Sequence, residues 1–216
     1  SDLKRTYWLI VCIAIVIVFS VQAAIPVIAQ KTPFTDIEGN THKEAIETLY
    51  AEGIVFGATR NKYEPNAIAT RGETAKMFAK ALQLDTINVK NPNFKDVPTS
   101  HAYYGEIAAL ANLGIVSGEN GSFRPNGNFK RSHAAKMLTL GFALNKASSI
   151  DSKFKDMPEH RDTALYIQTL INYSITQGTT ATTFSPNQGL TRGHVATFLY
   201  RTMNALRDDL NITTVE

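Results

Sequence analysis

The sequence is nearly without cysteine. Its single cysteine, Cys12, excludes a disulfide within the chain, a CxxC redox pair and a cysteine-based zinc cluster. A strong surplus of one charge is also missing, because 22 Lys and Arg stand against 19 Asp and Glu and give a net charge of +3. Lys and Arg are spread along the chain and do not form the basic stripe that nucleic-acid binding usually requires. We therefore expect no nucleic-acid partner, although a few well-placed cations could still bind an acidic ligand.

Short signatures of common enzymes are absent as well. The sequence has no GxSxG turn of a serine hydrolase, and its five histidines form neither HExxH nor another recognisable set of zinc ligands. We therefore expect no enzyme, no metal and no cofactor. Paired carboxylates of the glycosidase type leave no signature of their own, so a hydrolase of that kind stays an alternative.

One long apolar run lies near the N-terminus and is expected to be helical. Lys4 and Arg5 precede an unbroken apolar stretch at residues 7–19, and small residues follow up to Ala29. A basic start, an apolar core of this length and a small-residue exit are typical of a secretory signal peptide, so we predict that residues 1–29 are cleaved off. An uncleaved membrane anchor is the alternative, because the same segment is long enough to span about 30 Å of hydrocarbon. In both cases the rest of the chain lies outside the cytoplasm, and any membrane contact is through this segment alone.

Four landmarks recur three times along the chain. The first is a Phe two positions before an Asp, the second a glycine, the third an aromatic residue two positions before Pro-Asn, and the fourth an arginine. In this order they are Phe34, Phe94 and Phe154; Gly57, Gly118 and Gly178; Tyr63, Phe123 and Phe184; and Arg71, Arg131 and Arg192. Successive copies are 60 or 61 residues apart, so the chain is a tandem repeat. We divide it into repeats at residues 30–90, 91–150 and 151–206, followed by a polar tail at residues 207–216.

Each copy is expected to form a helix, a loop and a second helix. Apolar residues at i, i+3 and i+4 give each helix one stripe that faces a core, as with Ile46, Leu49 and Tyr50 in the first copy. Glycine and Pro-Asn supply the turn chemistry of the loop, and the second helix begins near the landmark arginine. One pair of helices cannot bury both stripes alone. We therefore predict a mainly α fold in which the three helical hairpins pack on one another.

The combined pattern resembles the S-layer homology (SLH) family. The stretch from Gly114 to Asn126 carries the resemblance most clearly, and the likeness extends from residue 34 to about residue 206. The resemblance implies a pseudo-threefold arrangement of the hairpins, with grooves between repeats that bind the secondary cell-wall polysaccharide of Gram-positive bacteria. In that family the ligand is typically a pyruvylated terminal sugar, and the arginine of a Thr-Arg-Ala-Glu motif reads its carboxylate. The implied function is non-covalent anchoring of a secreted surface protein to the cell wall.

The resemblance assigns candidate binding residues to two motifs. They are Arg71, Arg131 and Arg192, with Thr70 and Thr191 before two of them, and the loop glycines Gly57, Gly118 and Gly178. A planar guanidinium suits a carboxylate in bidentate geometry, and free N–H groups at a helix start also favour an anion. Because a cation in the first turn opposes the helix macrodipole, we expect the arginines to be exposed and to contribute little to folding.

The three copies of the arginine motif are not identical. The second copy has Lys130 and His133 in place of the Thr and Glu of the motif, and the third has His194 in place of the Glu. We therefore expect unequal sites, with Arg131 the weakest candidate and Lys130 either a second cation or a solvated side chain.

The loop glycines and the landmark aspartates allow structural interpretations as well. Each glycine serves either as a plain turn residue or as a place where a sugar can approach the backbone. The aspartates Asp36, Asp96 and Asp156 are expected to brace the loop and not to bind a ligand.

Two other functions stay open beside the polysaccharide-binding anchor. One is an extracellular enzyme that acts on the wall, and the other is a purely structural protein whose repeats assemble a surface layer.

Overall fold

The computed structural model describes residues 32–213, with side chains through Asp208. The predicted apolar helix and signal peptide at residues 1–29 lie outside the described residues. Six helices occur in the described part: α2 (Lys43–Ala51), α3 (Arg71–Ala81), α4 (Tyr104–Asn112), α5 (Arg131–Gly141), α6 (Arg161–Asn172) and α7 (Arg192–Thr213). Only isolated β-bridges accompany them there, so the predicted mainly α class is confirmed.

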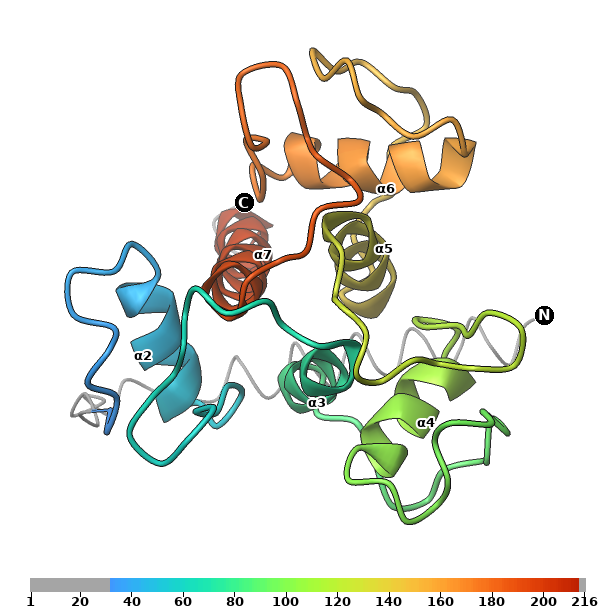
Figure 1. The fold of residues 1–216 in the computed structure, drawn as a ribbon. Helices are drawn as coiled ribbons and strands as arrows, with labels where there is room; N and C mark the ends of the chain where they lie inside the picture. The colour runs from blue at the N-terminus through green and yellow to red at the C-terminus, as the bar shows by residue number, and fades with distance from the viewer. Residues whose placement is uncertain (1–31, 214–216) are drawn as a thin grey trace.

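The helices are arranged around a pseudo-threefold axis. Figure 1 shows α3, α5 and α7 end-on around the centre, with α2, α4 and α6 outside them, one in each of three lobes. Each repeat contributes one outer and one central helix, and each central helix begins at the landmark arginine, as predicted. Within residues 32–208 no helix combines the length and the apolar character needed to cross a bilayer.

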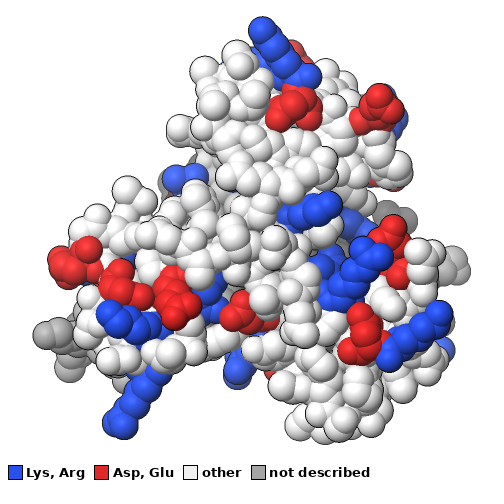
Figure 2. Space-filling model, viewed as in Figure 1, with Lys and Arg blue, Asp and Glu red and all other residues white. Residues whose placement is uncertain are grey.

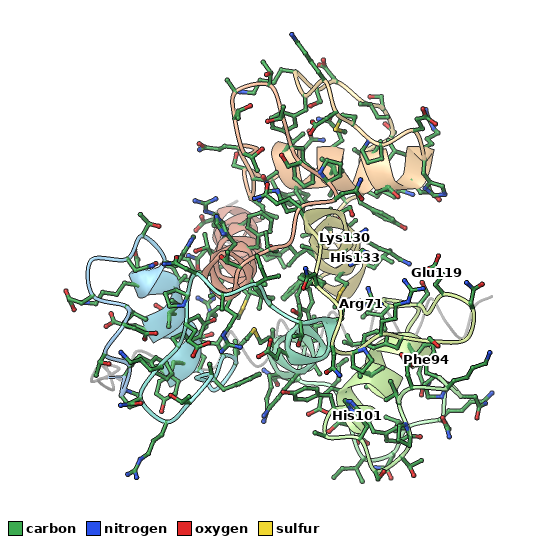
Figure 3. All side chains as sticks on the ribbon, in the orientation of Figure 1. Arg71, Phe94, His101, Glu119, Lys130 and His133 are labelled. Carbon is green, nitrogen blue, oxygen red and sulfur yellow. The ribbon has the colours of Figure 1, made fainter. Side chains whose placement is uncertain are left out.

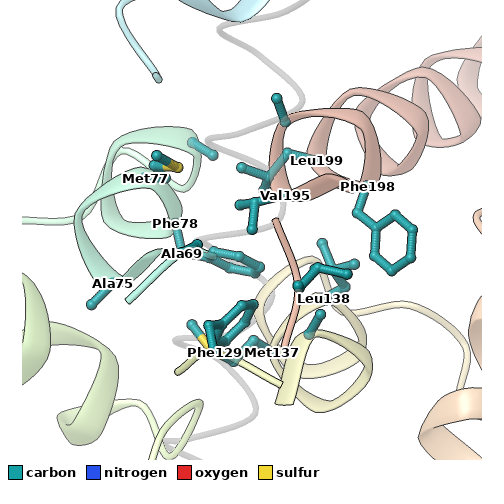
Figure 4. Packing of buried hydrophobic residues seen from close by; sticks show 14 of the residues in the cluster. Ala69, Ala75, Met77, Phe78, Phe129, Met137, Leu138, Val195, Phe198 and Leu199 are labelled. Carbon is teal, nitrogen blue, oxygen red and sulfur yellow. The ribbon is translucent and has the colours of Figure 1, made fainter. Parts of the chain in front are cut away.

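The core lies where the three central helices meet. Phe78 of α3, Leu138 of α5 and Leu199 of α7 are almost completely buried there, and Phe129 packs edge-on against Phe78 with ring centroids 6.3 Å apart (Figure 4). Burying one such side chain stabilises the fold by roughly 1.5–3 kcal/mol. Because each repeat supplies only part of this cluster, the three repeats share one core.

The closest helix pairs join neighbouring repeats. Helix α3 packs against α4, α5 against α6, and α7 against α2, which closes the ring from the last repeat back to the first. The cause is the path of the loop, because each Pro-Asn segment carries the chain from the outer helix to the axis. The central helix therefore starts beside the next repeat, and each lobe is built from two repeats.

Three backbone hydrogen bonds close a small ring at the axis. The N–H of Ala69 donates to the carbonyl of Leu190 at 2.9 Å, the N–H of Leu190 to the carbonyl of Phe129 at 2.7 Å, and the N–H of Phe129 to the carbonyl of Ala69 at 2.9 Å. Each bond links two different repeats. The ring therefore sets the register of the three loops that lead into the central helices.

The first N–H groups of the central helices are occupied. In α3 the N–H of Arg71 donates to the carbonyl of Gly127 at 2.9 Å, and that of Gly72 donates to the carbonyl of Pro125 at 2.8 Å. The corresponding N–H groups of α5 and α7 donate to carbonyls in the loop of the next repeat around the ring. These are the donors that a helix start leaves without a partner inside the helix. The expectation of free N–H groups that attract an anion is therefore wrong, because the neighbouring repeat already satisfies them.

Candidate functional site

A carboxylate braces the loop in each repeat. Asp96 accepts the N–H of Phe123 at 2.8 Å and that of Arg124 at 2.7 Å. Arg124 has a φ of 60°, in the left-handed region that is costly for a non-glycine residue, and the two hydrogen bonds offset that cost. Asp36 and Asp156 repeat the arrangement in the other two loops. The predicted bracing role of the aspartates is confirmed.

These hydrogen bonds also change the acidity of two of the carboxyl groups. Partial burial by itself would raise the pKa of Asp36 and Asp96, but the backbone N–H groups favour the charged form and hold each pKa below 3.8. Both groups therefore stay ionised at neutral pH and keep the loop in shape.

The three landmark arginines share one geometry. Each guanidinium donates from Nε to the carbonyl oxygen of the landmark aromatic in the next repeat around the ring, at 2.8 Å for Arg71, 2.7 Å for Arg131 and 2.8 Å for Arg192. Each also lies 4.5–4.9 Å from the centroid of that aromatic ring, within the range of a cation–π contact. We call the surroundings of Arg71, Arg131 and Arg192 the first, second and third arginine sites.

The third arginine site is closed. Arg192 is only 2% exposed, and it donates to the carbonyl of Phe56 at 2.6 Å and to the carboxylate of Glu73 at 2.9 Å. The guanidinium thus has a charged partner from the chain itself.

The second arginine site is also buried. Arg131 is 4% exposed, and its guanidinium lies 4.7 Å from the ring of Phe184 and 5.6 Å from that of Phe198. Burial lowers the pKa of Arg131 to about 10, although Asp156 opposes that shift. The expectation of exposed arginines is therefore wrong for Arg131 and Arg192, because the loop of the neighbouring repeat covers both.

The first arginine site is different. Arg71 is half-buried, with one terminal nitrogen 3.2 Å from Nδ1 of His133 and the other donating to the carbonyl of Ser117 at 3.2 Å. Burial lowers the pKa of His133 to about 4, and the positive charges of Arg71, Lys130 and Lys136 add to the effect. His133 is therefore neutral at physiological pH and can accept a hydrogen bond from Arg71.

A cavity of about 440 Å³ lies beside Arg71, which is within the usual size range of small-ligand sites. Figure 3 shows Arg71, Lys130, His133 and Glu119 around it, between the central helices and the loop of the second repeat. The charged and polar residues that line it are Arg71, Ser117, Glu119, Ser122, Arg124, Asn128, Lys130, His133 and Lys136.

Positive charge dominates this cavity. Four cations line it against one carboxylate, which leaves a balance of +3, and that carboxylate, Glu119, already pairs with Arg124 at 3.1 Å. Neither Arg71 nor Lys130 nor Lys136 forms an ion pair with a described side chain, although the carboxylate of Asp96 attracts Arg71 from a longer distance. Figure 2 shows blue side chains gathered at this place on the face of the molecule. The arrangement favours an anionic ligand of modest size.

The predicted glycines have a packing role in the loops. A Cβ on Gly118 would lie 2.7 Å from the ring of Phe94 and 2.7 Å from the carbonyl of Ser122, and Gly57 and Gly178 are packed in the same way against Phe34 and Phe154. Gly118 also lines the cavity. The absence of a side chain is thus required for packing, and a role of these glycines in ligand binding stays a prediction.

The predicted threonines cap helices. Thr70 accepts the N–H of Glu73 at 3.2 Å while Glu73 accepts the N–H of Thr70 at 2.9 Å, which is the reciprocal pattern of a capping box. Thr191 accepts the N–H of His194 at 3.2 Å. Neither threonine lines the cavity beside Arg71.

Sequence reasoning missed Lys136, whose ammonium group lies 3.4 Å from the hydroxyl of Ser117. A signal was present, because Lys130, His133 and Lys136 are spaced by three and such positions share one face of a helix. In the same part of the chain, residues 32–208, no group of three or more His, Asp or Glu side chains is placed to hold a metal ion.

Comparison with known proteins places the repeats in one family. A sequence profile described as the S-layer homology domain matches residues 33–75, 93–135 and 153–196. The chain is 32% identical over 180 residues to the Surface-layer 125 kDa protein of Lysinibacillus sphaericus, covering 81% of this chain and 15% of that protein. It is 29% identical over 180 residues to an S-layer protein of Bacillus thuringiensis subsp. finitimus, covering 82% of this chain and 22% of that protein.

A shorter match joins the chain to an anchoring protein. The Cellulosome-anchoring protein of Acetivibrio thermocellus is 33% identical over 78 residues, which cover 36% of this chain and 17% of that protein. The chain thus spans less than a quarter of the length of these three relatives.

Proposed function

The chain belongs to the S-layer homology domain family, and on that premise we propose that it anchors non-covalently to the bacterial cell wall by binding an anionic wall polysaccharide beside Arg71. The observation that carries the proposal is the cavity with a charge balance of +3 and three cations that form no ion pair with any described side chain. Names of the relatives support it, because two are surface-layer proteins and one is an anchoring protein. The proposed role is binding and not catalysis, and the proposed place is the surface of a Gram-positive cell.

The proposed ligand group is the carboxylate of a pyruvylated sugar. A guanidinium has five N–H donors, and the loop and His133 use three of those of Arg71. The two that are left can reach an anion, while the ammonium groups of Lys130, just before α5, and of Lys136 in α5 add positive charge. A ligand carboxylate would relieve the mutual repulsion of these cations, and charge-assisted hydrogen bonds of this kind are the stronger ones in proteins.

Co-sedimentation with purified wall sacculi tests the proposal. The chain should sediment with intact sacculi, and it should stay in solution after the polymer other than peptidoglycan has been stripped or after its pyruvyl groups have been removed. If binding survives removal of the pyruvyl groups, the carboxylate-reading proposal is wrong. If the chain assembles with itself and binds neither intact nor treated sacculi, the function of a purely structural surface-assembly protein is favoured. Release of sugar from the sacculi would instead indicate an extracellular enzyme that acts on the wall.

Variants of the two lysines separate binding from folding. Lys130→Thr and Lys136→Thr each introduce the residue that the third repeat has at the same position, Thr191 or Thr197. Each should weaken binding by about tenfold, the loss expected for one charge-assisted contact of about 1.4 kcal/mol. The matched control is Lys80→Thr, which removes an exposed lysine of α3 that does not line the cavity. It should leave binding unchanged.

A further inference from the structure

The three arginine sites differ most in the residues that approach from the next central helix. At corresponding positions these are Lys130, His133 and Lys136 at the first site, Thr191, His194 and Thr197 at the second, and Thr70, Glu73 and Lys76 at the third. The first site thus receives two cations, the second none, and the third one cation and one carboxylate. A pseudo-threefold backbone therefore carries three electrostatically unequal sites.

At the third site the chain supplies its own anion. The carboxylate of Glu73 bonds to Arg192 at 2.9 Å and to the N–H of Thr70 at 2.9 Å, so it lies where a ligand carboxylate would have to meet the guanidinium. Phe56 fills the place that Ser117 has at the first site. Its ring lies 4.3 Å from the ammonium nitrogen of Lys76 and 5.6 Å from the guanidinium of Arg192. Both cations of the third site already have partners.

At the second site the polar groups already have partners. The hydroxyl of Thr191 lies 2.7 Å from Nδ1 of His194, and that of Thr197 lies 2.7 Å from Nδ1 of His42. With Arg131 enclosed between two phenylalanine rings, this site offers an anion no exposed guanidinium.

We infer that the first arginine site alone binds the acidic group, and that Glu73 closes the third site by taking the place of the ligand carboxylate. The inference rests on the proposed function and assigns it to one of three related places. One chain then holds one polysaccharide end, in spite of its three repeats.

Titration with a defined probe tests the number and the place of the sites. The probe is a hexoside that carries a pyruvyl ketal, and the control is the same hexoside without the ketal. Calorimetry of the chain should give a stoichiometry of one. In nuclear magnetic resonance spectra the amide signals of Ser117 and Gly118 should shift with the probe, whereas those of Gly57 and Gly178 should stay in place. A stoichiometry of two or three, or shifts at Gly57 or Gly178, would overturn the inference and leave the proposed function standing. The absence of any binding would overturn both.

A graft tests why the third site is closed. The triple variant F56S/T70K/E73H gives that site the residues of the first, since Lys76 already corresponds to Lys136. It should bind a second probe molecule, with new shifts at Gly57, and its control E73Q should still bind one. A folded graft that still binds one probe would show that Glu73 and Phe56 are not what closes the site.

A matched loss variant covers the case in which the graft does not fold. K130T/K136T gives the first site the threonines of the second, and it should bind the probe at least about tenfold more weakly than the unchanged chain. If this variant binds as the unchanged chain does, the first site is not the binding site.

Discussion

Arg71 and Arg192 occupy corresponding positions but serve different purposes. Both stack on an aromatic ring and donate to two loop carbonyls. Arg192 also meets the carboxylate of Glu73 and is almost completely buried, whereas Arg71 meets a neutral histidine beside a cavity. The arginine at the third site therefore stabilises the fold, whereas the arginine at the first site lies beside the proposed ligand.

Replacement of Arg192 should destabilise the protein. In Arg192→Ala the carboxylate of Glu73 loses its charged partner and two loop carbonyls lose a donor, so the free energy of unfolding should fall by about 3–5 kcal/mol. Urea unfolding measures the change. Arg60→Ala is the control, because this exposed arginine lies in a loop and its loss should change stability by less than about 0.5 kcal/mol. An unchanged unfolding midpoint for Arg192→Ala would show that the buried ion pair contributes nothing.

Two half-buried histidines should make stability depend on pH. Burial, with nearby positive charge, lowers the pKa of His133 and of His194 to about 4, against an ordinary value of 6.5. Between these values the unfolded chain binds more protons than the folded one. The stability that depends on the two histidines staying neutral is therefore fully present above about pH 6.5 and is lost as the pH falls toward 4. The pKa values of Asp36 and Asp96 lie below 3.8, so these groups act only at lower pH.

Melting temperatures measured from pH 7 to pH 4 test this dependence. The unchanged chain should lose stability across the interval, and the double variant His133→Gln/His194→Gln should lose less, because glutamine keeps an acceptor and does not titrate. Parallel curves for the two proteins would contradict the assignment to these histidines.

At the scale of the element, the three central helices differ at their first residues. Thr70 and Thr191 cap α3 and α7 through their side chains, whereas Lys130 at the start of α5 makes no such bond. A lysine at this position lacks an acceptor and opposes the helix macrodipole. Helix α5 is therefore the least well capped of the three, and the lysine responsible is one that lines the cavity.

Lys130→Thr should raise stability while it weakens binding. A threonine there can accept the N–H of His133 as Thr191 accepts that of His194, and a good cap contributes about 0.5–2 kcal/mol. Thermal melts and co-sedimentation of the same preparation measure the two effects. The control Lys80→Thr should neither raise the melting temperature nor change binding, because Lys80 lies in the last turn of α3. A Lys130→Thr variant that loses both stability and binding would show that the lysine supports the fold.

At the scale of the whole molecule, the unit of sequence and the unit of structure do not coincide. A sequence repeat contains an outer helix and the central helix that follows it, whereas a lobe contains a central helix and the outer helix of the next repeat. The bond from Arg71 to Phe123 and the bridge between Thr70 and Asn128 lie inside one lobe and join two repeats. The ring is complete only when α7 meets α2.

Two fragments of equal length distinguish the repeat from the lobe. Residues 70–129 contain α3, α4 and the contacts between them, whereas residues 91–150 contain one sequence repeat, whose helices α4 and α5 are not among the closely packed pairs. Circular dichroism should show more helix in the first fragment, and the second should be largely unfolded. The whole chain should melt in one cooperative transition. A well-folded fragment 91–150 would contradict the shared core.

What the sequence determined by itself is local or periodic. The repeat period, the start of each central helix and the bracing by Asp96 all follow from apolar spacing or from motifs that recur in register. Turn chemistry and amphipathic spacing act between residues close in sequence, so these features could be predicted before the structure.

Tertiary structure decided which helices pack together, and it decided the partners and the burial of each landmark arginine. Arg192 meets Glu73 across 119 residues of sequence, and Arg71 meets His133 across 62, so neither partner could be read from the arginine motif alone. The same step from one lobe to the next brings Lys130 and Lys136 to the cavity beside Arg71 and leaves Arg131 enclosed. Burial and charge balance depend on which side chains lie opposite in space, and only the closed ring of three repeats specifies that.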